Sequence, residues 1–354
     1  MFRLFRIQVG FACLLCVLFA PVGCNKQSET DSVRHKTPIG EKTGQNTESS
    51  KTVAAKDSTK QTEEAEPVSN EHLVVTADWP QFRGANRDGR STETGLLESW
   101  PKQGPPLVWT FAKAGVGYSG PAIVGDRLYI MGAREGTEFL IAINTKNGEE
   151  EWAVKIGPMF TWKGNNWNRG PSATPTIAGD HIYALGGQGI LVCVDKDGKE
   201  VWRVDLPAKL GAVVNNIGGA PEKIGWGFAW SPLVDGDHLI CQPGGKQGTL
   251  AALNKHTGEV VWRSQSYNDE ASYASPVVAY IDGVKQYINL TNEGLTSVSP
   301  KDGSVLWRWE RKPPYNDCVI GTPIVWGNYV YASVGFGNGC DLIQIKNKKV
   351  TPPL

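Results

Sequence analysis

Several short motifs that mark common enzyme classes are missing from the 354-residue sequence. It contains no His-Glu-x-x-His zinc motif, no Gly-x-Ser-x-Gly nucleophile motif and no phosphate-binding loop. The four cysteines that follow Cys24 include neither a Cys-x-x-Cys pair nor a Cys-x-x-Cys-His haem attachment motif. Lys plus Arg and Asp plus Glu both number 36, and this zero formal charge indicates no polyanionic partner such as nucleic acid.

Aromatic side chains are absent from residues 25–77, which are rich in Ser, Thr, Lys, Glu and Gln. A stretch with so little apolar mass cannot offset the entropy lost on ordering. We therefore predict a disordered polar tether over residues 25–77. The folded part is expected to begin at residue 78 and to extend to residue 354.

Long apolar runs are also lacking, apart from residues 7–20 near the start. Arg3 and Arg6 precede this run, which is too short to span a membrane comfortably, so residues 1–24 are predicted to be a signal peptide. The sequence Pro21-Val22-Gly23-Cys24 resembles a bacterial lipobox, although Pro21 stands where leucine is usual. We expect lipidation of Cys24 and a cell-envelope location, in the periplasm or at the outer membrane. Ordinary cleavage with a free Cys24, or an uncleaved segment, are the alternatives.

A turn-plus-tryptophan unit recurs through the folded part, with a glycine four residues before each tryptophan. Its four copies are Gly148 and Trp152, Gly198 and Trp202, Gly258 and Trp262, and Gly303 and Trp307. Each copy follows a small-residue–Pro–apolar opening and a second Gly/Asp turn, which together predict four short strands per unit. The steps between these tryptophans are 50, 60 and 45 residues. Recurrence at this period predicts an all-β propeller of four-stranded blades.

The run from Ala252-Leu253-Asn254 through Gly258 to Trp262 resembles the tryptophan-docking repeat of the pyrroloquinoline-quinone-like propellers. This family includes quinoprotein alcohol dehydrogenases and non-enzymatic lipoproteins of the outer-membrane assembly machinery. The segment from Trp79-Pro80-Gln81 to Gly89 resembles the start of secreted bacterial members often labelled polyvinyl-alcohol-dehydrogenase-like. The resemblance covers roughly residues 78–345 and implies the propeller fold.

Complete blades are expected at about 116–156, 170–206, 228–266 and 272–311. Residues 107–111 resemble a last strand with Trp109 as its docking residue, and Gly321-Thr322-Pro323 opens a further blade that contains no docking tryptophan. The resemblance implies a ring of six to eight blades. This sequence accounts for about five blades, so we predict an incomplete, truncated propeller. A genuine small ring, or an open stack completed by another chain, are the alternatives.

Two insertions between blades, residues 157–169 and 207–229, hold the candidate binding residues. These are Trp162, Trp167, Arg169, Trp226 and Trp230. Aromatic anchors beside a fixed cation are enriched in binding hot spots, and loops at propeller faces commonly bind partners. The alternative is that these side chains only pack the top of the ring.

The function expected from these patterns is a binding or scaffold module for a protein or glycan partner in the cell envelope, without metal, cofactor or catalytic residues. The alternative is a quinoprotein alcohol or polyvinyl-alcohol dehydrogenase that uses pyrroloquinoline quinone (PQQ) and Ca²⁺. The resemblance would then imply a vicinal Cys-Cys disulfide, which this chain lacks, and carboxylate ligands that cannot be placed residue by residue. A non-functional truncated product is a third hypothesis. Cys193 is expected to be a buried thiol, and Cys318 and Cys340 could pair.

Overall fold

The computed structural model describes residues 78–162, 169–216 and 225–351. The predicted signal peptide, Cys24 and the polar tether lie outside the described residues. The described residues belong to one compact unit. No helix within them is long and apolar enough to cross a membrane.

Five four-stranded antiparallel sheets make up the fold, and each is a meander of consecutive strands. The first sheet holds β1 (Ala122–Val124), β2 (Arg127–Arg134), β3 (Thr137–Asn144) and β4 (Glu150–Pro158). The second holds β5 (Thr176–Ala178), β6 (His181–Leu185), β7 (Ile190–Asp195) and β8 (Glu200–Asp205). The third holds β9 (Leu233–Asp235), β10 (His238–Cys241), β11 (Ala251–Asn254) and β12 (Val260–Arg263). The fourth holds β13 (Val277–Ile281), β14 (Val284–Thr291), β15 (Gly294–Val298) and β16 (Val305–Glu310). The fifth holds β17 (Ile324–Trp326), β18 (Tyr329–Val334), β19 (Gly339–Lys346) and β20 (Lys349–Thr351).

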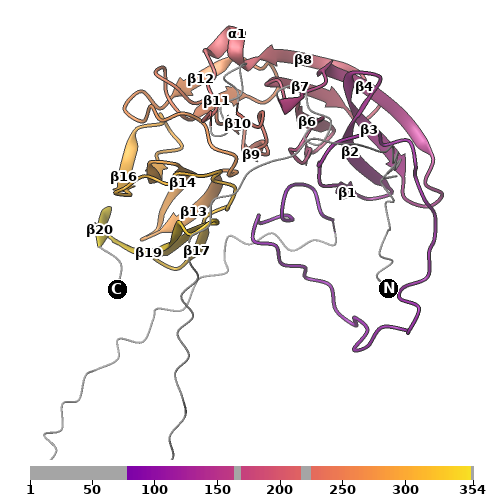
Figure 1. The fold of residues 1–354 in the computed structure, drawn as a ribbon, viewed down its shortest axis with the longest axis horizontal. Coiled ribbons are helices and arrows are strands. Elements are labelled where there is room, and N and C mark those ends of the chain that lie inside the picture. Colours follow the sequence, from indigo (N-terminus) through magenta and orange to yellow (C-terminus); the bar gives the residue numbers. More distant parts are fainter. Residues whose placement is uncertain (1–77, 163–168, 217–224, 352–354) are drawn as a thin grey trace, which may run out of the picture. The chain divides into compact units, whose positions relative to one another are not determined.

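These sheets are the blades of an incomplete propeller, as the repeat predicted. In Figure 1 each sheet runs from its first strand on the inner side to its fourth strand on the outer side. The four complete blades expected from the sequence are confirmed. The further blade that opens at Gly321-Thr322-Pro323 also has four strands, because β20 completes it, although it has no docking tryptophan.

The small residue that precedes each repeated turn is explained by strand register. Each docking tryptophan lies on a fourth strand directly opposite a small residue of the third strand. The four pairs are Ala142 with Trp152, Cys193 with Trp202, Ala252 with Trp262, and Ser297 with Trp307. A small side chain leaves room on that face of the sheet for the indole, and a register shift follows each pair.

Trp152, Trp202 and Trp262 each dock on the glycine of the following blade, not on the glycine of their own repeat. A Cβ at Gly198 would lie 2.9 Å from the Trp152 ring, and one at Gly258 would lie 2.9 Å from the Trp202 ring. The indole N–H groups of Trp152, Trp202 and Trp262 donate to Lys196, Lys255 and Pro300 carbonyls at 3.2, 2.9 and 3.0 Å, just before the glycine of each following turn. The repeated glycine is therefore needed for close approach as well as for its positive φ.

The joint between the fourth and fifth blades departs from this rule. The β19–β20 turn consists of Asn347 and Lys348, both at positive φ, and offers no glycine to Trp307. The Trp307 indole instead donates to Gln286 Oε1 of its own blade at 2.6 Å. A cavity of about 240 Å³, lined in part by Trp307 and Lys348, lies at this joint. This joint therefore lacks the tryptophan–glycine contact of the other three joints between successive blades.

The segment 107–111 is not a strand in the structure, which corrects the expectation from its sequence. Its Trp109 nevertheless makes the same joint as the tryptophans of the blades. The Trp109 indole donates to the Thr145 carbonyl at 2.8 Å, and a Cβ at Gly148 would lie 2.6 Å from its ring. Phe111 is buried beside it against the first sheet.

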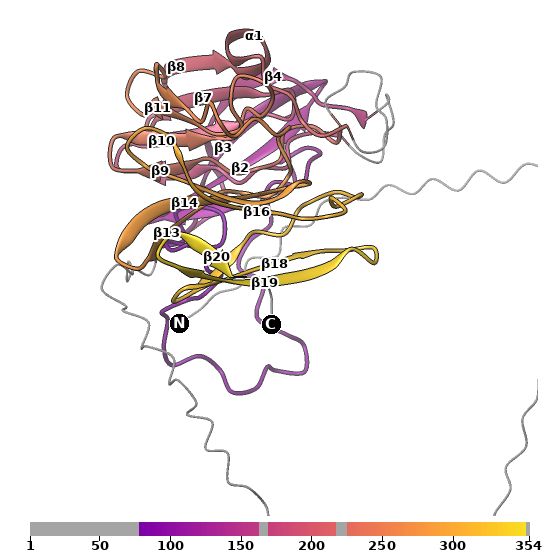
Figure 2. The same ribbon diagram turned by 90° about the vertical axis from the view of Figure 1, so that its left-hand side faces the viewer.

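An N-terminal segment, residues 78–89, ties the first strands of several blades together. Trp79 exchanges two backbone hydrogen bonds of 2.8 Å with Ile123 of β1, and the Ile177 N–H donates to the Pro80 carbonyl at 2.8 Å. The buried Arg87 guanidinium donates to the carbonyls of Ser231, Pro232 and Pro276, which precede β9 and β13. The segment therefore contacts the first four blades. Figure 2 shows these blades from the side.

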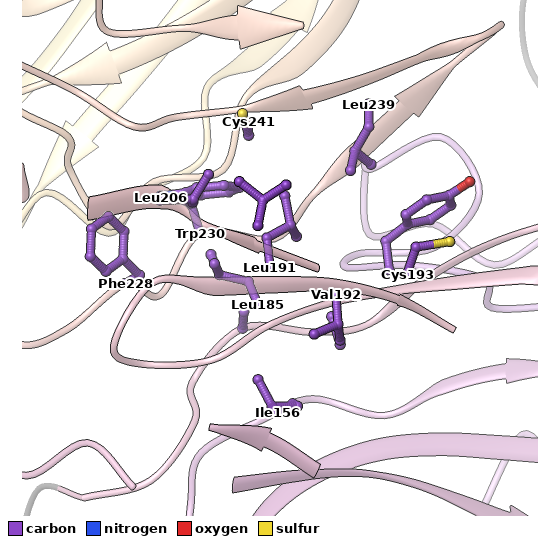
Figure 3. Packing of buried hydrophobic residues seen from close by; sticks show 14 of the residues in the cluster. Ile156, Leu185, Leu191, Val192, Cys193, Leu206, Phe228, Trp230, Leu239 and Cys241 are labelled. Carbon is purple, nitrogen blue, oxygen red and sulfur yellow. The ribbon is translucent and has the colours of Figure 1, made fainter. Parts of the chain in front are cut away.

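The main core lies between the second blade and its neighbours. Figure 3 shows Trp230, Phe228 and Leu206 packed with residues of β6, β7 and β10. Leu206 begins α1 (Leu206–Leu210), a single short helix in the described residues that the sequence did not predict; Asp205 caps its start. Cys193 is buried and free, as expected, and Cys318 and Cys340 are also free thiols in the structure.

Candidate functional site

The two insertions leave their blades at the same end as the β2–β3 and β6–β7 turns. Thr137 at the start of β3 pairs with Pro158 at the end of β4, so the first insertion begins beside the β2–β3 turn. Its ends are held as a hairpin by the Thr161–Arg169 bridge and by the Gly170 N–H, which donates to the Phe160 carbonyl at 2.8 Å. The base of this insertion is therefore well fixed on the blade.

Glu138 attaches this hairpin to the next blade. Its carboxylate accepts hydrogen bonds from the Phe160 N–H at 3.0 Å and from the Gly187 N–H at 2.9 Å. The side chain is 1% exposed. A Cβ at Gly186 would lie 2.6 Å from Glu138 Oε2, so glycine is needed for the turn to approach the carboxylate. Glu138 thus holds the first insertion against the β6–β7 turn.

The second insertion reaches the same turn from the other side. The Phe228 N–H donates to the Gly187 carbonyl at 2.9 Å. A Cβ at Gly227 would lie 2.9 Å from that carbonyl oxygen and 3.1 Å from the Phe160 ring. Gly187 therefore links the two insertions through its backbone: it donates to Glu138, which holds the first insertion, and it accepts from Phe228 of the second.

Trp162 and Trp226 stack on each other where the two insertions meet. Their ring centroids are 4.7 Å apart and their planes differ by 2°. Both side chains are partly exposed. The Trp226 N–H is held by the Tyr273 hydroxyl at 3.1 Å, and that hydroxyl donates to the Asn215 carbonyl at 2.9 Å. The result is an aromatic surface supported by Tyr273, which lies in the connection between the third and fourth blades.

The other candidate residues divide into three cases. Arg169 lies at the base of the first hairpin, opposite Thr161, and is partly exposed. Trp167 lies outside the described residues. Trp230 is wholly buried in the core, as Figure 3 shows, so we assign it to packing and not to the binding surface. We call Trp162, Arg169 and Trp226 the insertion surface.

Sequence reasoning missed Glu138 and the Gly186-Gly187 pair. The sequence does carry a signal for Glu138, because it is an acidic residue at the start of the apolar run Phe139-Leu140-Ile141. Its role depends on two backbone N–H groups from distant loops, which no local pattern reveals.

Glu138 is expected to make stability depend on pH. Burial raises the pKa of its carboxyl from 4.5 to about 7, and the two backbone N–H groups oppose that rise only in part. The unfolded chain loses this proton at lower pH than the folded chain does. The protonated Glu138 carboxyl therefore stabilises the fold fully below about pH 4.5, and this stabilisation is lost as the pH rises through about 7.

Across this pH range, the free energy of unfolding should fall by roughly 3 kcal/mol because of Glu138. Urea unfolding of the wild type and of Glu138→Gln, measured across this pH range, gives the comparison. The difference between their unfolding free energies should change with pH, because glutamine does not titrate. A difference that stays constant from pH 4 to 8 would show that the carboxylate is already ionised in the fold.

The residues of this site do not form a metal centre. Across the described ranges, no three His, Cys, Asp or Glu side chains gather so as to hold a metal ion. Trp162, Arg169 and Trp226 themselves carry no oxygen ligand of the kind that Ca²⁺ takes from side chains. The arrangement offers aromatic faces, a guanidinium and backbone groups, which suit contact with a partner surface.

Comparison with solved structures finds similar chains at low sequence identity. Quinohemoprotein alcohol dehydrogenase from Comamonas testosteroni has a TM-score of 0.45 and 15% identity, covering 76% of this chain and 46% of that one. ADHIIG, a quinohemoprotein alcohol dehydrogenase from Pseudomonas putida HK5, has a TM-score of 0.45 and 12% identity, with coverages of 77% and 58%. BamB from Moraxella catarrhalis has a TM-score of 0.37 and 16% identity, with coverages of 70% and 77%. The chain spans about half the length of these two dehydrogenases.

Comparison at the level of sequence identifies the family. No curated protein matches the chain. A family model described as outer membrane protein assembly factor BamB matches residues 159–349, more than half of the chain. This match covers most of the second to fifth blades, with three of the four Gly-x-x-x-Trp units and all three residues of the insertion surface. The chain therefore belongs to the BamB family of pyrroloquinoline-quinone-like repeat proteins.

Proposed function

We propose that this chain is a binding module of the cell envelope that contacts a protein partner through the insertion surface. The main support for this proposal is the stacked pair of Trp162 and Trp226, which brings together two insertions that are far apart in the sequence. The family description, an outer membrane protein assembly factor, supports a protein partner over a glycan. The proposed location is the periplasmic side of the outer membrane, with lipidation of Cys24 as the proposed anchor.

The physical case for binding is preorganisation. Both indoles are held by well-ordered backbone below them: Glu138 fixes the first insertion and Tyr273 fixes the second. An aromatic surface that is already ordered loses little side-chain entropy when a partner covers it. Trp and Arg are also the residue types that most often dominate interface energies.

The test is site-specific photocrosslinking of the full chain in cells of its source. A photoreactive residue at Trp162 should crosslink to a defined protein in the envelope fraction. The matched control is the same residue at Lys146, an exposed position in the β3–β4 turn at the other end of the blade. The double variant Trp162→Ala, Trp226→Ala should lose copurification of the crosslinked protein. Trp100→Ala, which removes a tryptophan that is 52% exposed elsewhere, should retain it.

Equal crosslinking from positions 162 and 146 would exclude the insertion surface as the binding site. A separate titration of the purified chain with PQQ and Ca²⁺, followed by alcohol and an artificial electron acceptor, tests the dehydrogenase alternative. Saturable PQQ binding with dye reduction would overturn the binding-module proposal.

A further inference from the structure

A hollow of about 330 Å³ lies where the N-terminal segment passes the openings of the first two blades. Its lining comes from three stretches of the chain, one in that segment, one before β1 and one before β5: Trp79, Phe82 and Arg83; Tyr118; Ser172 and Thr174. The first strands form the inner side of the blades, so the hollow belongs to that side (Figure 1). It shares no residue with the insertion surface.

The backbone around the hollow is fixed by contacts between these stretches. The Tyr118 N–H donates to the Pro171 carbonyl at 2.8 Å, which joins the openings of the first two blades. The Thr174 N–H donates to the Ser231 hydroxyl oxygen at 3.0 Å. A Cβ at Gly120 would lie 2.7 Å from Thr174 Oγ1, so glycine is needed for this close approach. A ligand in the hollow therefore meets walls that are already in place.

Arg83 brings a positive charge without an anionic partner to the hollow. Its side chain is partly buried, and its Nη2 donates to the Asp88 carbonyl at 3.2 Å. No carboxylate pairs with it, and its other N–H groups have no partner among the residues that the structure describes. Other partly buried arginines of the chain do pair with carboxylates: Arg127, Arg134, Arg308 and Arg311. The planar guanidinium of Arg83 is thus left to bind a carboxylate from outside the chain.

The remaining lining residues combine aromatic faces with a hydroxyl group. Trp79 and Phe82 are partly buried, whereas Tyr118 is 62% exposed and leaves most of its ring open to a ligand. Aromatic faces suit a ring that presents apolar C–H groups. The Ser172 hydroxyl is partly exposed and has no hydrogen-bond partner in the described part of the chain, so it can both donate to a ligand and accept from it.

We propose that this hollow binds a sugar acid, that is, a pyranose ring that carries a carboxylate. The carboxylate pairs with Arg83, the C–H face of the ring lies on Tyr118, and a ring hydroxyl bonds to Ser172. A neutral sugar would leave the guanidinium unpaired, and a flat aromatic acid would leave the Ser172 hydroxyl unused. The volume is near the lower end of the roughly 300–1,000 Å³ of ligand pockets, which suits a single ring.

The probe is D-glucuronate, added to the full-length chain and followed by calorimetry and by saturation-transfer NMR. We expect saturable binding with a dissociation constant of about 1 mM, which is ordinary for a ligand of this size. Binding should weaken as salt is added, because it includes an ion pair. D-Glucose, which lacks the carboxylate, should bind roughly tenfold more weakly or less.

Three substitutions locate the site. Arg83→Gln should weaken D-glucuronate binding roughly tenfold or more, because the charged fork is lost. Tyr118→Ala should weaken it roughly three- to tenfold, and this exposed position keeps the test valid if Arg83→Gln does not fold. The matched control is Arg90→Gln, an exposed arginine seven residues further along, which should bind as the wild type does. Thermal unfolding of each variant separates loss of the fold from loss of binding.

Several results would overturn the proposal. One is the absence of D-glucuronate binding; another is binding of D-glucose or benzoate as tight as that of D-glucuronate. A third is unchanged D-glucuronate affinity in folded Arg83→Gln or folded Tyr118→Ala. None of these results depends on Trp162 or Trp226, so this test and the crosslinking test fail independently.

Discussion

Replacing Trp202 with alanine is expected to lower the free energy of unfolding by about 3 to 5 kcal/mol. The indole is 9% exposed and fills the joint between the second and third blades, where it lies on Gly258 and beside Tyr183. The substitution removes this packing and leaves the Lys255 carbonyl without its 2.9 Å indole donor. Urea unfolding measured by circular dichroism gives the change. Trp100→Ala is the control and should stay within about 0.5 kcal/mol of wild type, because Trp100 is 52% exposed.

A double-mutant cycle with Gly258 tests the joint itself. Gly258→Ala alone should lower the free energy of unfolding by about 2 to 4 kcal/mol. Part of this loss comes from the positive φ and part from the clash with the Trp202 ring. In the Trp202→Ala background the 2.9 Å contacts with the indole are gone, so the loss of unfolding free energy should fall to about 1 to 2 kcal/mol, from the backbone and from a 3.2 Å contact with the Val204 side chain. Additive losses would mean that the tryptophan and the glycine do not act as one joint.

Replacing Arg87 with alanine is expected to lower the free energy of unfolding by about 2 to 4 kcal/mol. Burial lowers the pKa of Arg87 to about 9, so the side chain remains charged at neutral pH. Its guanidinium donates to Gln81 Oε1 at 2.8 Å and to the Pro276 carbonyl at 2.9 Å, besides the carbonyls of Ser231 and Pro232. Removal leaves these acceptors unsatisfied and loosens the segment 78–89 from the third and fourth blades.

Arg90→Ala is the matched control for this prediction. Arg90 is three residues away and exposed, and should change stability by less than about 0.5 kcal/mol. Hydrogen exchange should also show faster opening of the Trp79–Ile123 backbone pair in Arg87→Ala and not in Arg90→Ala. Unchanged exchange at that pair would mean that Arg87 does not hold the segment in place.

The sequence repeat predicted the blades but not how they are joined. Gly258 and Trp262 recur as a pair at fixed spacing because both belong to one hairpin, which is a local constraint. Their partners are Trp202 and Gly303, about one repeat away in either direction. Nothing within one copy shows that its glycine serves the tryptophan of the previous blade.

The candidate site was predicted in part. The insertions were visible as departures from the repeat, and two of their tryptophans, Trp162 and Trp226, meet in the structure. Trp230 was grouped with them because it follows Trp226 closely, yet strand β9 begins just after it and carries it into the core. Arg87 could not be foreseen, because its ligands are backbone carbonyls that carry no sequence signature.

The offset between tryptophan and glycine also bears on how such a chain grows. One repeat copy holds half of each of two joints: a glycine that receives the preceding indole and an indole that enters the following glycine. Tandem duplication of a copy therefore supplies both halves together, and the new blade fits between its neighbours without compensating substitutions. Loss of one glycine has the opposite effect, since it ends the series of matched joints at that position. The Asn347-Lys348 turn occupies such a position in this chain.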